Sequence, residues 1–154
     1  MSVVGIITNS SNIIELEKKL NIIVINEKSI ENMKNVKFDI VIIYQETKQN
    51  ENIKQLISTC KYLVINTDIK ENLKLLEGID LSETTIITYG FNRKSSITIV
   101  SNENDEIILE IQREINNLKG EKIECQEIKL QNNLEKNHIY LAISLKILEI
   151  LEKI

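Results

Sequence analysis

The chain has 154 residues, the usual size of one folded domain and enough to bury a core without disulfides or a structural metal. Its net charge of -4 arises from 19 basic and 23 acidic residues spread along the chain, so we expect no basic face for nucleic acid or anionic lipid. No apolar stretch is long enough to span a membrane and no signal-peptide pattern is present, so the sequence predicts a cytoplasmic protein.

The apolar and sulfur-containing residues indicate what kind of core and what kinds of binding site to expect. Hydrophobic residues make up 42% of the chain and aromatic residues only 4%, which predicts an aliphatic core without stacking platforms for bases. Cys60 and Cys125 lie far apart and neither belongs to a Cys-x-x-Cys pair, so we expect buried free thiols, no metal and no cofactor.

Short apolar runs alternate with helical patterns through the first half of the chain. The runs predicted as strands are 3–8, 22–25, 39–44, 61–66 and 84–89. Apolar residues at helical spacing lie between them, with predicted faces of Ile13, Leu16 and Leu20, of Ile53, Leu56, Ile57 and Cys60, and of Ile69, Leu73 and Leu76. This alternation predicts a parallel sheet with helices on both faces.

The pattern changes after Gly90. Two alternating runs, 97–101 and 107–111, flank a polar turn and predict an antiparallel hairpin, although 107–118 also fits a helix through Ile108, Ile111, Ile115 and Leu118. A third antiparallel strand is predicted over Ile123, Cys125 and Ile128, and a closing helix from about Leu134 with an apolar face of Leu141, Leu145, Leu148 and Ile150. The predicted fold is one α/β domain over 1–154, a three-layer Rossmann-like, mostly parallel sheet with a small antiparallel sheet in the last third.

Candidate ligand-binding residues follow the predicted strands, because ligands bind at the carboxyl ends of parallel strands. After the first strand, Ser10, Ser11 and Asn12 have donors for an anion at a helix N-terminus, or they act as helix caps. After the fourth strand, Asn66 and Asp68 occupy a position that contacts a ribose or a metal in some α/β folds, or they form a turn.

Two further segments carry polar residues of interest. Asn137 and His138, the only histidine, stand at the start of the closing helix, where an imidazole serves as a base, a cap or a surface residue. The segment 93–96 holds two cations and two serines, which suits either an anion or an ordinary loop. The acidic residues are scattered singly, so no catalytic residue is predicted.

Three segments in this order resemble the central domain of the Mur ligases, the ATP-dependent enzymes that join amino acids to peptidoglycan precursors. They are LVINTD at 63–68, TIITYG at 85–90 and NHIYLA at 137–142. The family shows a strand that ends in Asn-x-Asp, a later Thr-Tyr-Gly and a His-Asn-x-Tyr-Asn-Ala helix start. The resemblance extends from Val3 to about Ile150 and implies an α/β domain with a nucleotide site after its first strand.

The departures from the family pattern fall where the chemistry would occur. The phosphate-binding loop of the family would lie over 5–13, where Thr8 and Ser11 replace glycines, Asn12 replaces the lysine and Ile13 replaces the hydroxyl residue. The Asp-His pair expected after the third strand is missing from 44–50, and Leu141 replaces the asparagine that contacts adenine. Loss of one such contact costs about 10²- to 10³-fold in rate, so we expect no ligase activity from this chain.

The resemblance and the departures together predict a non-catalytic Mur-ligase-like domain that acts as a binding or assembly module, with a link to cell-envelope metabolism by ancestry. An alternative is a weak site for a nucleotide or another anionic small molecule in the crevice after the first strand. The partner is either an unknown protein or a second copy of the chain. In the second case Ile97, Ile99 and Leu109 of the hairpin extend a sheet across a two-fold axis or cover a sheet edge.

Overall fold

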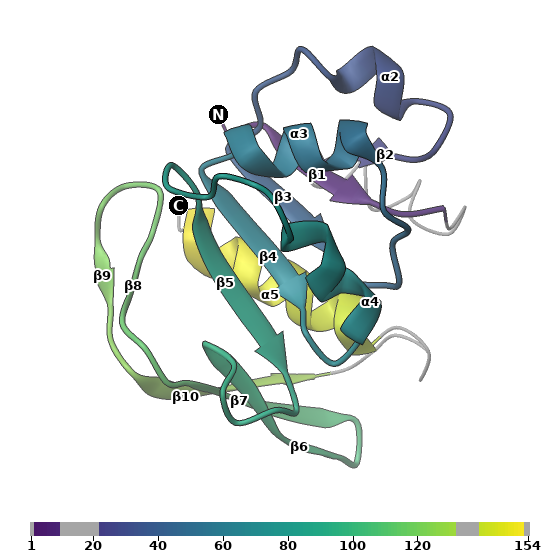
Figure 1. Ribbon diagram of the computed structural model, residues 1–154. Helices are drawn as coiled ribbons and strands as arrows, with labels where there is room; N and C mark the ends of the chain where they lie inside the picture. Colours follow the sequence, from purple (N-terminus) through teal and green to yellow (C-terminus); the bar gives the residue numbers. More distant parts are fainter. Residues whose placement is uncertain (1, 10–21, 132–138, 153–154) are drawn as a thin grey trace. The chain divides into compact units, whose positions relative to one another are not determined.

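The computed structural model describes residues 2–9, 22–131 and 139–152 (Figure 1). The first half contains β1 (Val4–Ile7), β2 (Ile22–Ile25), α2 (Ile30–Met33), β3 (Ile40–Ile43), α3 (Glu51–Thr59), β4 (Tyr62–Asn66), α4 (Lys70–Leu73) and the 3₁₀ turn η2 (Lys74–Leu76). The second half contains β5 (Thr85–Gly90), β6 (Ile97–Glu103), β7 (Glu106–Ile111), β8 (Ile115–Asn116), β9 (Lys122–Ile123), β10 (Gln126–Gln131) and α5 (Ile139–Glu152).

The strands form one large mixed sheet and one small antiparallel sheet. The large sheet has the order β10-β7-β6-β5-β4-β3-β1-β2, while β8 pairs only with β9. Strands β1 to β4 pair in parallel, as do β5 and β6, whereas β7 is antiparallel to both β6 and β10. The predicted mostly parallel, Rossmann-like α/β fold is therefore confirmed. Within the described ranges, no helix combines the length and apolarity that crossing a membrane requires.

The chain divides into two compact units, residues 1–65 with 69–86 and residues 66–68 with 87–154. The division falls within β4 after Ile65 and within β5 after Ile86, so each unit contains part of both strands. The first unit holds β1 to β3 and most of β4, and the second holds most of β5, the strands β6 to β10 and α5.

The core of the first unit forms where α3 packs on one face of its strands. Ile53, Leu56 and Ile57 are the buried residues of α3, and they join a cluster with alternate residues of the strands, such as Val41 and Ile43 of β3. The intervening residues of β3 are also fully buried, which is why this strand is a continuous apolar run. α3 begins at Asn50, whose side chain accepts a hydrogen bond from the Asn52 backbone N–H at 2.7 Å.

The second unit contains the predicted hairpin. Asn104 and Asp105 both have positive φ, 53° and 61°, as the tight turn between β6 and β7 requires. The alternative helix over 107–118 is wrong, because β7 and β8 occupy most of that stretch. The predicted third antiparallel strand is β10, which begins at Gln126, after Ile123 has already paired in β9.

Two predicted apolar faces need correction. Leu73 is 42% exposed, because α4 is a single turn that tightens into η2 and buries Asn72 and Leu75 instead of the predicted stripe. In α5, Leu141 and Leu148 are buried as predicted, whereas Leu145 and Ile150 are only half-buried. The buried residues of α5 are Leu141, Ile143, Ser144, Ile147, Leu148 and Leu151.

The hairpin side chains predicted to join two copies are inside the chain. Ile97, Ile99 and Leu109 are at most 3% exposed. An apolar residue that is already buried offers no surface to a partner. These three residues are therefore not available to form an interface.

We expect Gly5→Val to destabilise the protein, because a Cβ at this position would lie 2.7 Å from Ile25 Cδ1 and 2.8 Å from Phe38 Cε1. Overpacking of this kind destabilises a protein by about 1–3 kcal/mol. Replacing a glycine also stabilises the folded state by lowering the entropy of the unfolded chain, but this effect is smaller. Urea denaturation measures the loss, and Val100→Ala at an exposed strand position is the control, with a change below about 0.5 kcal/mol. An unchanged midpoint for Gly5→Val would contradict this packing.

The two cysteines differ, contrary to the prediction that both are buried. Cys60 is buried, and burial raises the pKa of its thiol to about 12, whereas Cys125 is exposed. We expect one fast-reacting thiol in the native protein in a disulfide-exchange assay near neutral pH, and none in Cys125→Ser. A second fast thiol in wild type would show that Cys60 is accessible.

Candidate functional site

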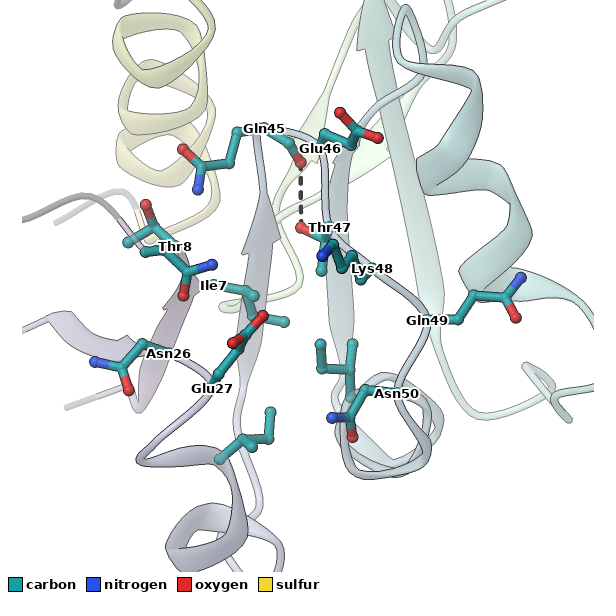
Figure 2. Close-up of a pocket in the computed structure, with 13 residues that line it drawn as sticks. Ile7, Thr8, Asn26, Glu27, Gln45, Glu46, Thr47, Lys48, Gln49 and Asn50 are labelled. Atoms are coloured by element: carbon teal, nitrogen blue, oxygen red, sulfur yellow. Dashed lines mark hydrogen bonds between the residues drawn. The ribbon is translucent and has the colours of Figure 1, made fainter.

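A polar cleft opens at the carboxyl ends of β1, β2 and β3 (Figure 2). Its volume is about 490 Å³, and it is lined by residues 7–9, 26–27, 45–50, Ile30 and Ile53, all in the first unit. Small-molecule sites usually measure about 300–1,000 Å³, so the cleft has the size for such a ligand.

The position of the cleft follows from the strand order. Within the first unit β1 lies between β2 and β3, so chain connections leave β1 and β3 in opposite directions along the sheet. Ligands in open α/β sheets bind at this point of reversal, outside the carboxyl ends of the strands. The cleft therefore occupies the place where the topology predicts a binding site.

The base of the cleft is apolar, and the lining residue Thr8 bonds to a buried tyrosine that lies outside the lining. Ile7, Ile30 and Ile53 are buried and supply the apolar surface. Thr8 Oγ1 and Tyr44 OH are hydrogen-bonded at 2.8 Å. Burial raises the pKa of Tyr44, so its hydroxyl stays protonated at neutral pH.

The loop after β3 is held in place by contacts with α4 and η2. The Thr47 backbone N–H donates to Asn72 Oδ1 at 3.0 Å, and Gln49 Nε2 donates to the Lys74 carbonyl at 3.3 Å. The Thr47 hydroxyl donates to the Gln45 carbonyl at 3.1 Å, the bond drawn in Figure 2. The wall formed by 45–50 is thus preorganised, which lowers the entropic cost of binding a ligand.

Two asparagines at the rim have fixed orientations. Asn26 Oδ1 accepts from the backbone N–H groups of Lys28 and Ser29, both at 2.9 Å, and Asn50 Oδ1 accepts from Asn52 N–H. With each oxygen committed to the backbone, the amide nitrogen remains as the donor. Figure 2 shows the Asn50 amide nitrogen turned toward the opposite wall, where a ligand acceptor would lie.

Among the described lining residues, the charged groups are two carboxylates and one ammonium. Glu27, Glu46 and Lys48 are all exposed at its rim, and Figure 2 shows the Glu27 carboxylate directed into the cleft. In the described part of the chain, no group of three or more His, Cys, Asp or Glu side chains is placed to hold a metal ion. The described lining offers amide, hydroxyl, carboxylate and ammonium groups for hydrogen bonding to a polar molecule.

The predicted residues Asn66 and Asp68 lie in the second unit and form a turn. Asp68 N–H donates to Asn66 Oδ1 at 3.0 Å, while the Asp68 carboxylate accepts from Phe91 N–H at 2.9 and 3.0 Å and from Tyr140 OH at 2.8 Å. The carboxylate is therefore engaged by its own chain. Of the two readings, the turn is the one that this geometry favours.

Gly90 makes the approach of Asp68 possible. A Cβ at Gly90 would lie 2.8 Å from Asp68 Cγ, so any larger residue would push the carboxylate away. The adjacent Tyr89 hydroxyl hydrogen-bonds to Ser144 Oγ at 2.5 Å and donates to the Tyr140 carbonyl at 3.2 Å. One residue from each of the three segments quoted for the Mur ligase resemblance, Asp68, Gly90 and Tyr140, thus belongs to one cluster in the second unit.

The structure describes only some of the other predicted site residues. Ser10, Ser11, Asn12, Asn137 and His138 lie outside the described residues. In the segment 93–96 the two cations are exposed, but Ser95 and Ser96 are buried and hydrogen-bond to Thr67 and Thr88. These two serines serve the fold and are not displayed to an anion.

The lining of the cleft was missed by the sequence analysis, apart from the loop after the first strand. Its side chains come from loops after the second and third strands and contain no recognised motif. Only the position of these loops in the sequence could have indicated the site, since every loop that follows a parallel strand is a candidate for ligand binding. Comparison of the sequence with protein-family models and with curated proteins finds no match.

We expect Tyr140→Phe to lower stability at pH 8 by about 1–2 kcal/mol, because it removes a hydrogen bond to a charged acceptor. Burial, the hydrogen bond to Asp68 and the charge of Asp68 raise the pKa of Tyr140 to about 12. The raised pKa means that the stabilisation is complete below pH 10, the unfolded value, and is lost as pH rises toward 12.

Urea denaturation of wild type and Tyr140→Phe from pH 8 to 11 measures this effect. The difference in unfolding free energy between the two proteins should shrink above pH 10. A difference that stays constant over this range would contradict the contact between Tyr140 and Asp68.

Proposed function

We propose that the protein is a non-catalytic, Mur-ligase-like binding domain whose cleft at the ends of β1, β2 and β3 holds a small polar molecule with at most one negative charge. The observation that carries the proposal is the cleft itself, with a volume of about 490 Å³ at the reversal of strand order.

The charge of the lining supports this ligand class. Lys48 provides one ammonium for one anionic group, while the carboxylates of Glu27 and Glu46 repel any further negative charge. A nucleoside triphosphate would bring several negative charges, about three or four at neutral pH, into this setting. The amide and hydroxyl groups of the lining instead suit ligand hydroxyl, amide or amine groups.

The lack of catalysis is supported by the side chains that line the cleft. The described lining contains no histidine, cysteine or aspartate, and its residues after β1, Thr8 and Asn9, provide neither a glycine-rich loop nor a phosphate-binding lysine. Descent from a Mur ligase central domain would explain such a scaffold with its phosphate loop replaced, and would make the link to cell-envelope metabolism one of ancestry.

A thermal-shift screen followed by calorimetry tests the proposal. The panel contains neutral and zwitterionic metabolites, sugars and nucleosides, together with nucleoside triphosphates and peptidoglycan precursors. A ligand at 100 times its dissociation constant adds about 2.7 kcal/mol, which corresponds to about 5–10 °C in Tm for a domain of this size. We expect stabilisation by a compound with at most one negative charge.

The binding must also depend on the cleft. Glu27→Trp places an indole in the cleft and should abolish the stabilisation, whereas Glu31→Trp, on exposed α2 surface outside the lining, should preserve it. Absence of any stabilising compound, or equal binding by both variants, would refute the proposed site. Micromolar binding or hydrolysis of ATP would refute the ligand class and the lack of catalysis.

A further inference from the structure

Strand β10 is an edge of the large sheet. Among the described strands its hydrogen-bonded neighbour is β7, with Gln126 opposite Ile111 and Gln131 opposite Glu106. Its side chains are exposed or half-buried along the whole strand. An edge strand leaves a row of backbone N–H and C=O groups on its outer side, which another strand can pair with.

The side chains of β10 divide into two rows. Ile128 and Leu130 lie opposite Leu109 and Ile107 of β7, which are fully buried, so these two belong to the core face. Glu127 and Lys129 project from the other face and are exposed. The apolar row and the charged row restrict which registers a second strand can adopt.

Among the described residues, the charged row is unbalanced. Glu127 lies directly opposite Glu110 of β7, and no ion pair is formed by Glu127, Glu110 or Lys129 with any other described residue. Like charges directly opposite on adjacent strands are destabilising. A lysine on the outer side of β10 would offset this repulsion.

A second copy of β10 supplies that lysine. In an antiparallel pair centred on Ile128, Glu127 of each copy faces Lys129 of the other and the two Ile128 side chains face each other on the core side. Centring the pair on Glu127 or on Lys129 would instead place that residue opposite its own charge. Of these three registers, which keep the core faces on the same side, the charges select the first.

We propose that two copies of this chain associate through β10, paired antiparallel about a two-fold axis at Ile128. The interface uses backbone hydrogen bonds along the edge, two Glu127–Lys129 pairs and the apolar contact of the two Ile128 side chains. Because a single edge strand buries little area, the dimer is reversible and salt-sensitive. This inference does not depend on the proposed ligand.

Charge reversal in the full chain tests the proposal by sedimentation equilibrium at low salt. Glu127→Lys and Lys129→Glu each place two like-charged pairs at the interface, and each should raise the dimer dissociation constant about tenfold. The double variant Glu127→Lys/Lys129→Glu restores opposite charges and should recover wild-type association. Lys28→Glu, at an exposed turn of the first unit, is the matched control and should leave the constant unchanged.

Cross-linking tests the register independently. In a Cys125→Ser background, Ile128→Cys should form a disulfide-linked dimer under mild oxidation, because the two introduced thiols face each other, whereas Lys129→Cys should not. Circular dichroism establishes that each variant is folded. A monomeric wild type at high concentration, a dimer insensitive to both reversals, or equal cross-linking at the two positions would overturn the proposal.

Discussion

The parallel register of β1, β2 and β3 is the constraint on which the candidate site depends. Ile7 pairs with Ile25 on one side and with Ile43 on the other, so the three strands end at the same level. Their following loops must therefore leave the sheet together, and because β1 lies between its two neighbours those loops diverge. The space between them is the cleft, and its apolar base consists of strand-end and helix residues that the core already requires.

The second unit depends on a different kind of interaction, a single carboxylate that satisfies donors from separate segments. Asp68 accepts from the backbone after β5 and from the tyrosine in the first turn of α5. Such charge-assisted bonds are stronger than neutral ones, and they join segments that are far apart in sequence. The absence of a side chain at Gly90 is what allows the carboxylate to come so close.

Much of the fold could be predicted from the sequence, because the buried strands are runs of Ile, Val and Leu that the turn residues delimit. α2 could not, since it is a single turn with only Ile30 buried and no side-chain cap bond. The exposure of Leu73 and Cys125 depends on how short elements pack. Sequence periodicity does not indicate this exposure, because it needs a longer element to be informative. Of the candidate site, the end of the first strand was predictable from the sequence. The loops 26–27 and 45–50 can be identified as lining the same cleft only when the strand order is known.

The Asp68 cluster and the loop after β1, the two places compared with the Mur ligase pattern, differ in what their residues would do. The matching residues Asp68, Gly90 and Tyr140 are held together by packing and hydrogen bonds within this chain, so the fold alone gives a physical reason for each. A motif whose residues are used in this way constrains the architecture of the second unit. The phosphate loop is the opposite case, because its glycines and lysine serve the ligand and not the core. The proposed ancestry would therefore predict that the Asp68 cluster is kept while the glycines and lysine of the loop are replaced.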